Sequence, residues 1–164
     1  MIRILLVEDF APLRTRLTDL LNIPGEMSVT ATAATELEAH DQIEATDFDI
    51  LVVDVQLREG NGVGAVRNAR KRWISTLPSL IIMLTNHAFP VVRQRCLAAG
   101  ADHFLDKIRQ FDQLVPLILK WRSGPLARLG VAWAALARGT MTWIRVPCGA
   151  FVLMVNLPPR LSMR

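Results

Sequence analysis

Short apolar runs alternate with amphipathic stretches along the first 122 residues. Runs rich in β-branched residues are typical of strands that are buried on both faces of a sheet. The run around residue 29 is weaker than the others, and the run around residue 104 is shorter. The predicted strands are Ile2–Val7, Met27–Thr32, Ile50–Val53, Leu80–Leu84 and His103–Leu105.

Turn and capping residues delimit helices between these strands. Pro24 and Gly25 end the first helical pattern, and Gly100 is placed to end the fourth in the left-handed conformation. Thr35 and Glu38 have the spacing of a capping box. The predicted helices are Leu13–Leu21, Thr35–Ile43, a segment from the glycine-rich turn at 59–62 to about Trp73, Val91–Ala99 and Phe111–Trp121, in which Pro116 is tolerable only near the first turn.

This alternation predicts the fold class and the place of several polar residues. Five strands alternating with five helices predict an α/β domain, a doubly wound (βα)5 parallel five-stranded sheet with helices on both faces. Right-handed crossovers place the carboxyl ends of all strands at one edge, where open α/β sheets bind their ligands. The residues expected at that edge are Glu8, Asp9, Asp54, Thr85 and Lys107.

Composition and charge narrow the class of protein without identifying a ligand. Apolar residues make up 51% of the chain, which excludes disorder throughout. Five of the 19 basic residues and none of the 15 acidic residues lie from Ser123 onward, so the first 122 residues are close to neutral. The net charge of +4 is therefore no argument that the main domain binds nucleic acid.

Cysteine usage and the first residues predict a cytoplasmic protein. Cys96 and Cys148 match no metal-binding or redox spacing, which favours buried or incidental thiols in a reducing compartment. Residues 1–3 lead directly into the first predicted strand, so we expect no signal peptide.

Ser123, Gly124 and Pro125 mark a predicted boundary between a domain at 1–122 and an apolar, basic extension at 123–164. No stretch of this extension reaches the roughly 18 uninterrupted apolar residues that span a bilayer. A helix at 126–137 fits the pattern, but we expect no DNA-binding helix-turn-helix. Three interpretations remain: a disordered or partly helical extension, an amphipathic segment that contacts a partner or a membrane surface, or a relic without function.

The carboxylates expected at the carboxyl edge predict a cation. Three such groups repel one another unless a positive charge lies between them, and oxygen ligands without histidine or cysteine favour magnesium over zinc. Thr85 and Lys107 would hold the oxygens of a phosphoryl group, and metal and ammonium together would disperse its charge during transfer. Asp54 is then the expected nucleophile, which forms an acyl phosphate.

Four motifs at strand ends give residues 1–122 a family resemblance. They occur in one order and with family-like spacing. The segment resembles the receiver domain of bacterial two-component response regulators, which implies a flavodoxin-like fold. The motifs are Ile4–Asp9, Ile50–Asp54, Ile82–Thr85 and Ala98–Lys107.

The resemblance implies a metal-assisted phosphoacceptor. Asp54 would accept a phosphoryl group from a sensor histidine kinase, a histidine phosphotransfer protein or a small phosphodonor. Glu8, Asp9 and Asp54 would hold magnesium together with the backbone carbonyl of Gln56.

The resemblance also implies a switch. Thr85 would move to hydrogen-bond the phosphoryl group, Lys107 would contact its oxygens, and the ring of Phe104 would then turn inward. A core aromatic without a switching role is an equal alternative for Phe104. The output would be a changed surface around the fourth helix and fifth strand, which recruits or releases a protein partner or pairs two receivers.

Several residues depart from the family pattern. Glu8 replaces the commoner aspartate of the acidic pair, and Arg58 stands where proline is frequent. Ile108 follows Lys107 where proline is usual, so we expect no cis peptide bond there. Asn86 stands where a smaller residue is typical. We expect it, together with His87 and Gln56, to alter the lifetime of the phosphoryl group, in either direction.

Three functions compete at this stage. The leading interpretation is a single-domain response regulator in a two-component phosphorelay, which is a signalling phosphoprotein and not an enzyme. A pseudo-receiver that binds partners without being phosphorylated is the second. The third is an aspartate-nucleophile phosphohydrolase of the haloacid-dehalogenase kind, which needs an acid–base aspartate two residues after Asp54, where Gln56 stands.

Overall fold

A parallel sheet of five strands forms the body of the protein. The computed structural model describes residues 1–72, 80–86, 88–123, 142–145 and 152–155. The strand order is β2-β1-β3-β4-β5, and every neighbouring pair is parallel, so the predicted sheet is confirmed. The strands are β1 (Ile2–Val7), β2 (Met27–Ala33), β3 (Ile50–Asp54), β4 (Leu80–Thr85) and β5 (His103–Asp106).

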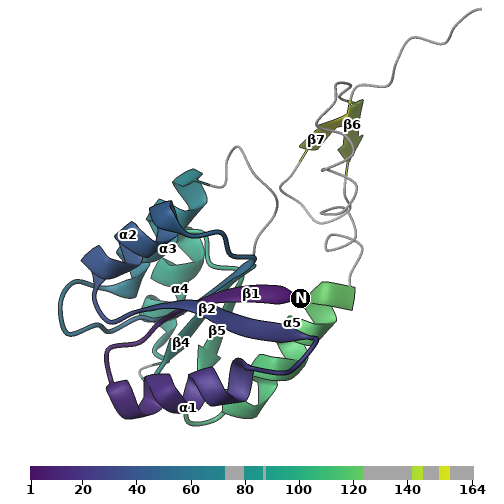
Figure 1. Ribbon diagram of the computed structural model, residues 1–164. Helices are drawn as coiled ribbons and strands as arrows, with labels where there is room; N and C mark the ends of the chain where they lie inside the picture. Colours follow the sequence, from purple (N-terminus) through teal and green to yellow (C-terminus); the bar gives the residue numbers. More distant parts are fainter. Residues whose placement is uncertain (73–79, 87, 124–141, 146–151, 156–164) are drawn as a thin grey trace, which may run out of the picture.

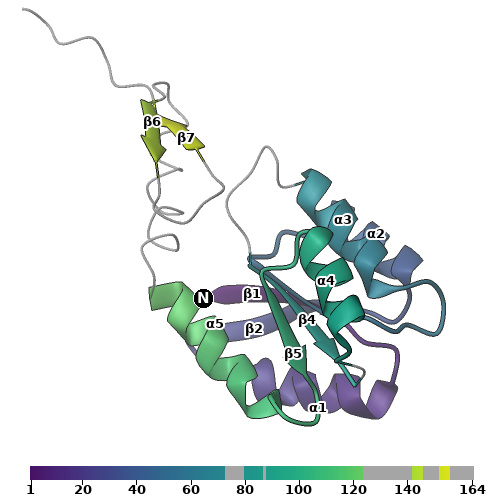
Figure 2. The ribbon, with the colours of Figure 1, turned by 180° about the vertical axis from the view of Figure 1, so that it is seen from behind.

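Helices cover both faces of this sheet. Helices α1 and α5 lie on one face, whereas α2, α3 and α4 lie on the other, as the two opposite views show (Figure 1, Figure 2). This arrangement confirms the predicted doubly wound α/β fold. The helices are α1 (Ala11–Leu21), α2 (Glu36–Ala45), α3 (Gly62–Arg72), α4 (Pro90–Ala98), a short 3-10 turn η2 (Phe111–Gln113) and α5 (Leu114–Ser123).

Alternation of side chains along the strands divides the core into two layers. In β3, Leu51 and Val53 pack with residues of α2, α3 and α4, whereas Ile50 and Val52 pack with residues of α1 and α5. All four side chains are fully buried because helices cover both sides of the strand. This double cover is why the sequence of β3 is continuously apolar rather than alternating.

Element ends follow the predictions with small shifts. Thr35 caps α2 by accepting the Glu38 N–H at 3.1 Å. The capping box is only partly formed, because the Glu38 carboxylate accepts the N–H of Ala34 rather than that of Thr35. Helix α5 begins at Leu114, after the turn η2, and Pro116 therefore lies in its first turn, where no backbone N–H is needed.

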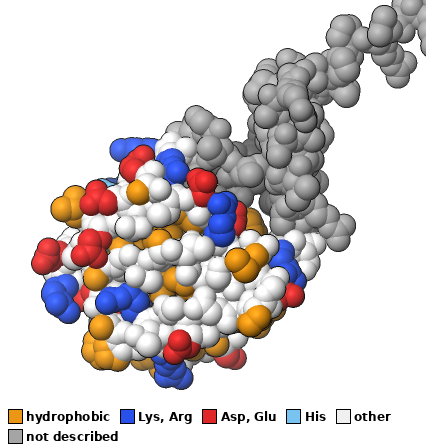
Figure 3. Space-filling view, in the orientation of Figure 1, with side chains coloured by type: hydrophobic (Ala, Val, Ile, Leu, Met, Phe, Trp, Pro, Cys, Tyr) orange, Lys and Arg blue, Asp and Glu red, His pale blue; other side chains and the backbone are white. Residues whose placement is uncertain are grey.

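Charges of both signs are interspersed on the face that Figure 3 shows, and neither sign dominates its described side chains. Several arginines pair with aspartates, as Arg3 does with Asp49 and Arg70 with Asp102. This mixed surface agrees with the near-neutral charge of the first 122 residues.

Two short strands are described in the C-terminal extension. Strands β6 (Thr142–Arg145) and β7 (Val152–Val155) pair antiparallel. The helix expected at 126–137 lies outside the described residues, as does Cys148. None of the helices that the structure describes has the length and apolar character needed to cross a bilayer. The boundary at 123 and the three interpretations of the extension stay predictions.

The packing of α1 on the sheet predicts a large loss of stability on truncation of Leu17, which is fully buried. The substitution Leu17→Ala should lower the free energy of unfolding by about 2–5 kcal/mol, because the cavity cannot fully collapse. Urea unfolding followed by circular dichroism measures the change. The control is Leu37→Ala on α2, because Leu37 is 71% exposed and its loss should cost less than about 0.5 kcal/mol. Equal losses would contradict this account of the core.

Candidate functional site

The carboxyl edge of the sheet gathers the polar residues that follow its strands. Glu8 and Asp9 come directly after β1, Asp54 ends β3, Thr85 ends β4 and Lys107 comes directly after β5. Parallel pairing brings these strand ends together, although the residues are spread over a hundred positions. The structure thus places all five expected residues at one edge.

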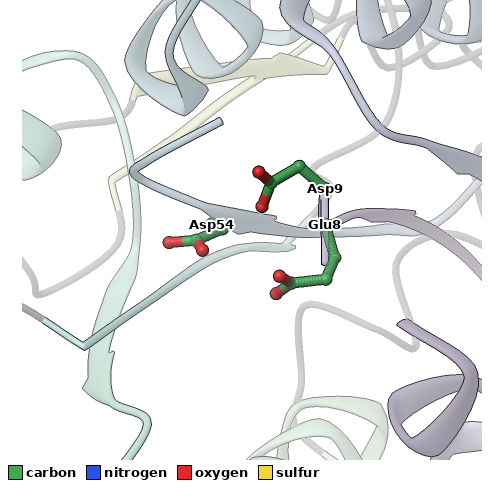
Figure 4. A group of neighbouring side chains, drawn as sticks. All are labelled: Glu8, Asp9 and Asp54. Carbon is green, nitrogen blue, oxygen red and sulfur yellow. The ribbon is translucent and has the colours of Figure 1, made fainter. Parts of the chain in front are cut away.

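Three carboxylates lie close together at this edge (Figure 4). Glu8, Asp9 and Asp54 each offer an oxygen, and these oxygens all lie within 4.8 Å of one another. Glu8 is 2% exposed and Asp54 7% exposed, so neither charge is fully solvated. Such a group of hard oxygen donors fits the coordination of a magnesium ion.

Lys107 supplies the positive charge of the site. Its Nζ donates to Glu8 Oε2 and to Asp54 Oδ2, both at 2.6 Å. The lysine is itself buried, at 8% exposure, and its backbone N–H donates to the carbonyl oxygen of Thr85 at 2.9 Å. One ammonium therefore pairs with two carboxylates of a cluster of three, and the remaining negative charge is suited to a divalent cation.

Backbone groups complete the environment of the two buried carboxylates. The Gln56 N–H donates to Asp54 Oδ1 at 3.2 Å, and the Phe10 N–H donates to Glu8 Oε1 at 3.3 Å. Each carboxylate thus receives one hydrogen bond from Lys107 and one from the backbone. Gln56 is exposed and follows Asp54 by two positions. The role of its backbone carbonyl as a further metal ligand stays a prediction.

Burial raises the pKa of the Glu8 carboxyl above its ordinary value, and the charge of Asp54 raises it further. The hydrogen bond and charge of Lys107 act in the opposite direction without cancelling the effect of burial. The folded protein therefore holds the proton of the Glu8 carboxyl more tightly than the unfolded chain does.

Thr85 and Phe104 lie deeper than the carboxylates. Thr85 is fully buried at the end of β4, and Phe104, at 9% exposure, packs in the core layer beneath α2, α3 and α4. The ring of Phe104 thus occupies an inward position in this structure. Whether Thr85 and Phe104 switch remains a prediction.

A pocket of about 270 Å³ opens over the site. The three carboxylates and Lys107 line it, together with Gln56, Arg58 and Asn86. Asn86 and Gln56 are exposed and line the same pocket as Asp54, so both would lie beside a group bound to Asp54. A phosphoryl group and its attacking or leaving partner could therefore reach Asp54 from solvent.

The turn after Lys107 is held without proline. Asp106 Oδ1 accepts the N–H groups of Ile108 and Arg109 at 2.8 and 3.2 Å. Ile108 is 78% exposed, and no cis peptide bond occurs among the described residues, as the sequence predicts.

Arg14 is a contributor that sequence reasoning missed. Its Nη1 donates to the carbonyl oxygens of Glu8 and Asp9 at 2.6 and 3.4 Å. The arginine thereby holds the turn between β1 and α1 whose side chains face the pocket. The sequence offers one signal for this contact, which is the position of Arg14 in the first turn of α1. That signal is weak, because arginines at such positions are usually solvated.

Comparison with known proteins places these features in a family. A family model described as the response regulator receiver domain matches residues 4–119. The transcriptional regulatory protein LnrK of Bacillus subtilis is 30% identical over 125 residues, which cover 76% of this chain and 55% of LnrK. The DNA-binding transcriptional activator DevR/DosR of Mycobacterium tuberculosis is 31% identical over 108 residues, which cover 65% of this chain and 48% of that protein.

Solved structures agree with the family match. A two-component response regulator of the LuxR family from Aurantimonas sp. SI85-9A1 superposes with a TM-score of 0.67 at 26% identity, covering 82% of this chain and 99% of that one. The chain spans about half the length of the two curated relatives, so their DNA-binding and regulatory activities are properties of those proteins.

Burial of the Lys107 ammonium predicts that a variant without it depends on a divalent cation for its stability. In chelator, Lys107→Met should lower the free energy of unfolding by about 3 kcal/mol, because Glu8 and Asp54 are left unpaired in a buried site. Added Mg²⁺ should recover most of that loss by binding the folded form. Urea unfolding with and without Mg²⁺ measures both effects. Lys120→Met, at an exposed position on α5, is the control and should do neither.

The raised pKa of Glu8 predicts a pH dependence of defined sign. A folded-state pKa above the ordinary value of 4.5 means that the folded protein binds this proton more tightly than the unfolded chain. As pH rises from 4.5 in chelator, wild-type stability should therefore fall relative to Glu8→Gln, which has no proton to lose. Unfolding free energies over a pH series test this, and a wild-type stability that rises with pH relative to that of Glu8→Gln would contradict it.

Proposed function

The chain belongs to the response regulator receiver family, and from this premise we propose that it is a signalling phosphoacceptor of a two-component system, phosphorylated on Asp54. The observation that carries the proposal is the meeting of Asp54, the acidic pair Glu8–Asp9 and Lys107 at one open pocket. The single-domain form and cytoplasmic location expected from the sequence are parts of the same proposal.

In the proposed reaction, a carboxylate oxygen of Asp54 attacks the phosphorus of a phosphohistidine or of a small phosphodonor. The new O–P bond forms as the P–N or P–O bond of the donor breaks, and the donor keeps the electron pair. Magnesium, held by Glu8, Asp9, Asp54 and the Gln56 carbonyl, would neutralise charge on the phosphoryl oxygens.

Lys107 and Thr85 would act on the product of this transfer. Lys107 already donates to Asp54 Oδ2, so a small movement would let its ammonium contact a phosphoryl oxygen instead. Thr85 ends the neighbouring strand, from which its hydroxyl would turn toward the phosphoryl group. The acyl phosphate would thus be held by an ammonium and a hydroxyl of the protein, in addition to the metal.

The proposed output is a changed surface around α4 and β5. A second pocket of about 400 Å³ lies there, lined among others by Arg93, Leu97, Phe104 and Leu117. Phe104 belongs both to this pocket and to the core layer, so a shift of its ring would alter the surface. A protein partner or a second receiver would bind this face, while a histidine kinase or phosphotransfer protein would approach Asp54.

Phosphorylation of Asp54 is tested by intact-protein mass spectrometry after incubation with Mg²⁺ and acetyl phosphate. Wild type should gain the mass of one phosphoryl group, chelator should abolish the gain, and Asp54→Ala should gain nothing. Asp112→Ala, which removes an exposed aspartate of η2, should behave as wild type. A folded protein that accepts no phosphoryl group from acetyl phosphate or from a panel of histidine kinases would instead be a pseudo-receiver.

A further inference from the structure

A carboxylate from α2 reaches across to the loop that follows β3. The N–H of Asn61 donates to Glu36 Oε2 at 2.8 Å. In the other direction, the N–H of Glu36 donates to the carbonyl oxygen of Glu59 at 3.0 Å. The first residue of α2 is therefore bonded to the loop twice, and α2 lies beside α3 on the same face of the sheet (Figure 1).

Two glycines leave the space in which the Glu36 side chain lies. A Cβ on Gly60 would overlap the Glu36 side chain, and a Cβ on Gly64 would overlap Glu36 Oε1. Gly60 also has a φ of +81°, which other residues rarely adopt. The Glu36 side chain thus fills space that a larger residue at position 60 or 64 would occupy. Only 27% of that side chain remains exposed.

The loop segment that Glu36 holds lies beside the candidate metal site, with Asn61 opposite Gln56. Asn61 pairs with Gln56 in an isolated antiparallel bridge, and the Gln56 N–H donates to Asp54 Oδ1. The N–H of Gly62 donates to the carbonyl oxygen of Val55 at 3.0 Å, which closes the loop further. The position of the Gln56 backbone therefore depends on the position of Asn61.

We propose that Glu36 is a positioning residue for the metal site, which holds the 55–61 loop so that the Gln56 carbonyl faces the cation. The proposal rests on the proposed function, because it needs the cation that Glu8, Asp9 and Asp54 would bind. The described bonds of Glu36 to the loop go to Glu59 and Asn61, so Glu36 acts on the site through Asn61. Groups that orient ligands in this way commonly determine how tightly a metal binds.

Electron paramagnetic resonance of Mn²⁺ measures how much of the ion the chain binds. This measurement tests the proposal without any phosphoryl transfer. Glu36→Ala should weaken Mn²⁺ binding roughly tenfold, as losses of such supporting groups do. Glu36→Gln should restore most of the affinity, because its amide oxygen can still accept the Asn61 N–H. The matched control is Glu38→Ala, since Glu38 is also in the first turn of α2 but accepts the Ala34 N–H, outside the loop.

A double-mutant cycle separates the contact from general damage to the loop. Gly64→Ala should displace the Glu36 carboxylate and weaken Mn²⁺ binding by itself. In the Glu36→Ala background the same glycine substitution should have no further effect, because the overlapping group is gone. Additive effects of the two substitutions would overturn the proposal.

Asp9→Asn distinguishes failure of this inference from failure of the proposed function. If Asp9→Asn loses Mn²⁺ but Glu36→Ala binds as wild type does, the metal site stands and the role of Glu36 is wrong. Equal weakening in Glu36→Ala and Glu38→Ala would also overturn that role, since it would reflect helix stability. If wild type binds no Mn²⁺, or Asp9→Asn binds it equally well, the proposed site and this inference both fail.

Discussion

Charge balance among buried groups is the constraint on which this structure depends. The Lys107 ammonium lies between the carboxylates of Glu8 and Asp54, and all three side chains are almost completely removed from water. Buried charges are tolerated only when they are paired and hydrogen-bonded. The ends of β1, β3 and β5 must therefore meet with little freedom of position, and the apolar layers on both faces of the sheet hold them there.

Because of the same charge balance, a cation or a phosphoryl group bound at the site would change the contacts of Lys107. Lys107 satisfies one oxygen of Glu8 and one of Asp54, while Asp9 contributes a further carboxylate to the cluster. A divalent cation would share these carboxylates with the ammonium, because the cluster holds three carboxylates and Lys107 bonds to only two of them. A phosphoryl group on Asp54 would redirect the ammonium in turn. In the proposed function, each event would change the contacts between these strand ends.

Much of this arrangement could be predicted from the sequence because it follows from periodicity and topology. Apolar runs located the strands, Gly100 ends α4 with a φ of +110° as expected, and parallel order placed Asp54 beside Glu8. The contacts of Arg14 and Glu36 could not be predicted. They join side chains to backbone groups of other elements, and no local pattern encodes which group a long side chain will reach. The same reason explains why the sequence did not predict that the Glu38 carboxylate accepts the N–H of Ala34 instead of that of Thr35.

The separation of the paired charges along the chain has a consequence for assembly of the molecule. Lys107 follows Glu8 by 99 residues and Asp54 by 53 residues. During synthesis from the amino terminus, β1 and β3 are complete before β5 exists. Until β5 pairs with β4, the Lys107 ammonium cannot lie between the carboxylates of Glu8 and Asp54. The last strand of the five-stranded sheet therefore brings the counter-charge, and completion of this sheet and neutralisation of its acidic edge are one folding event.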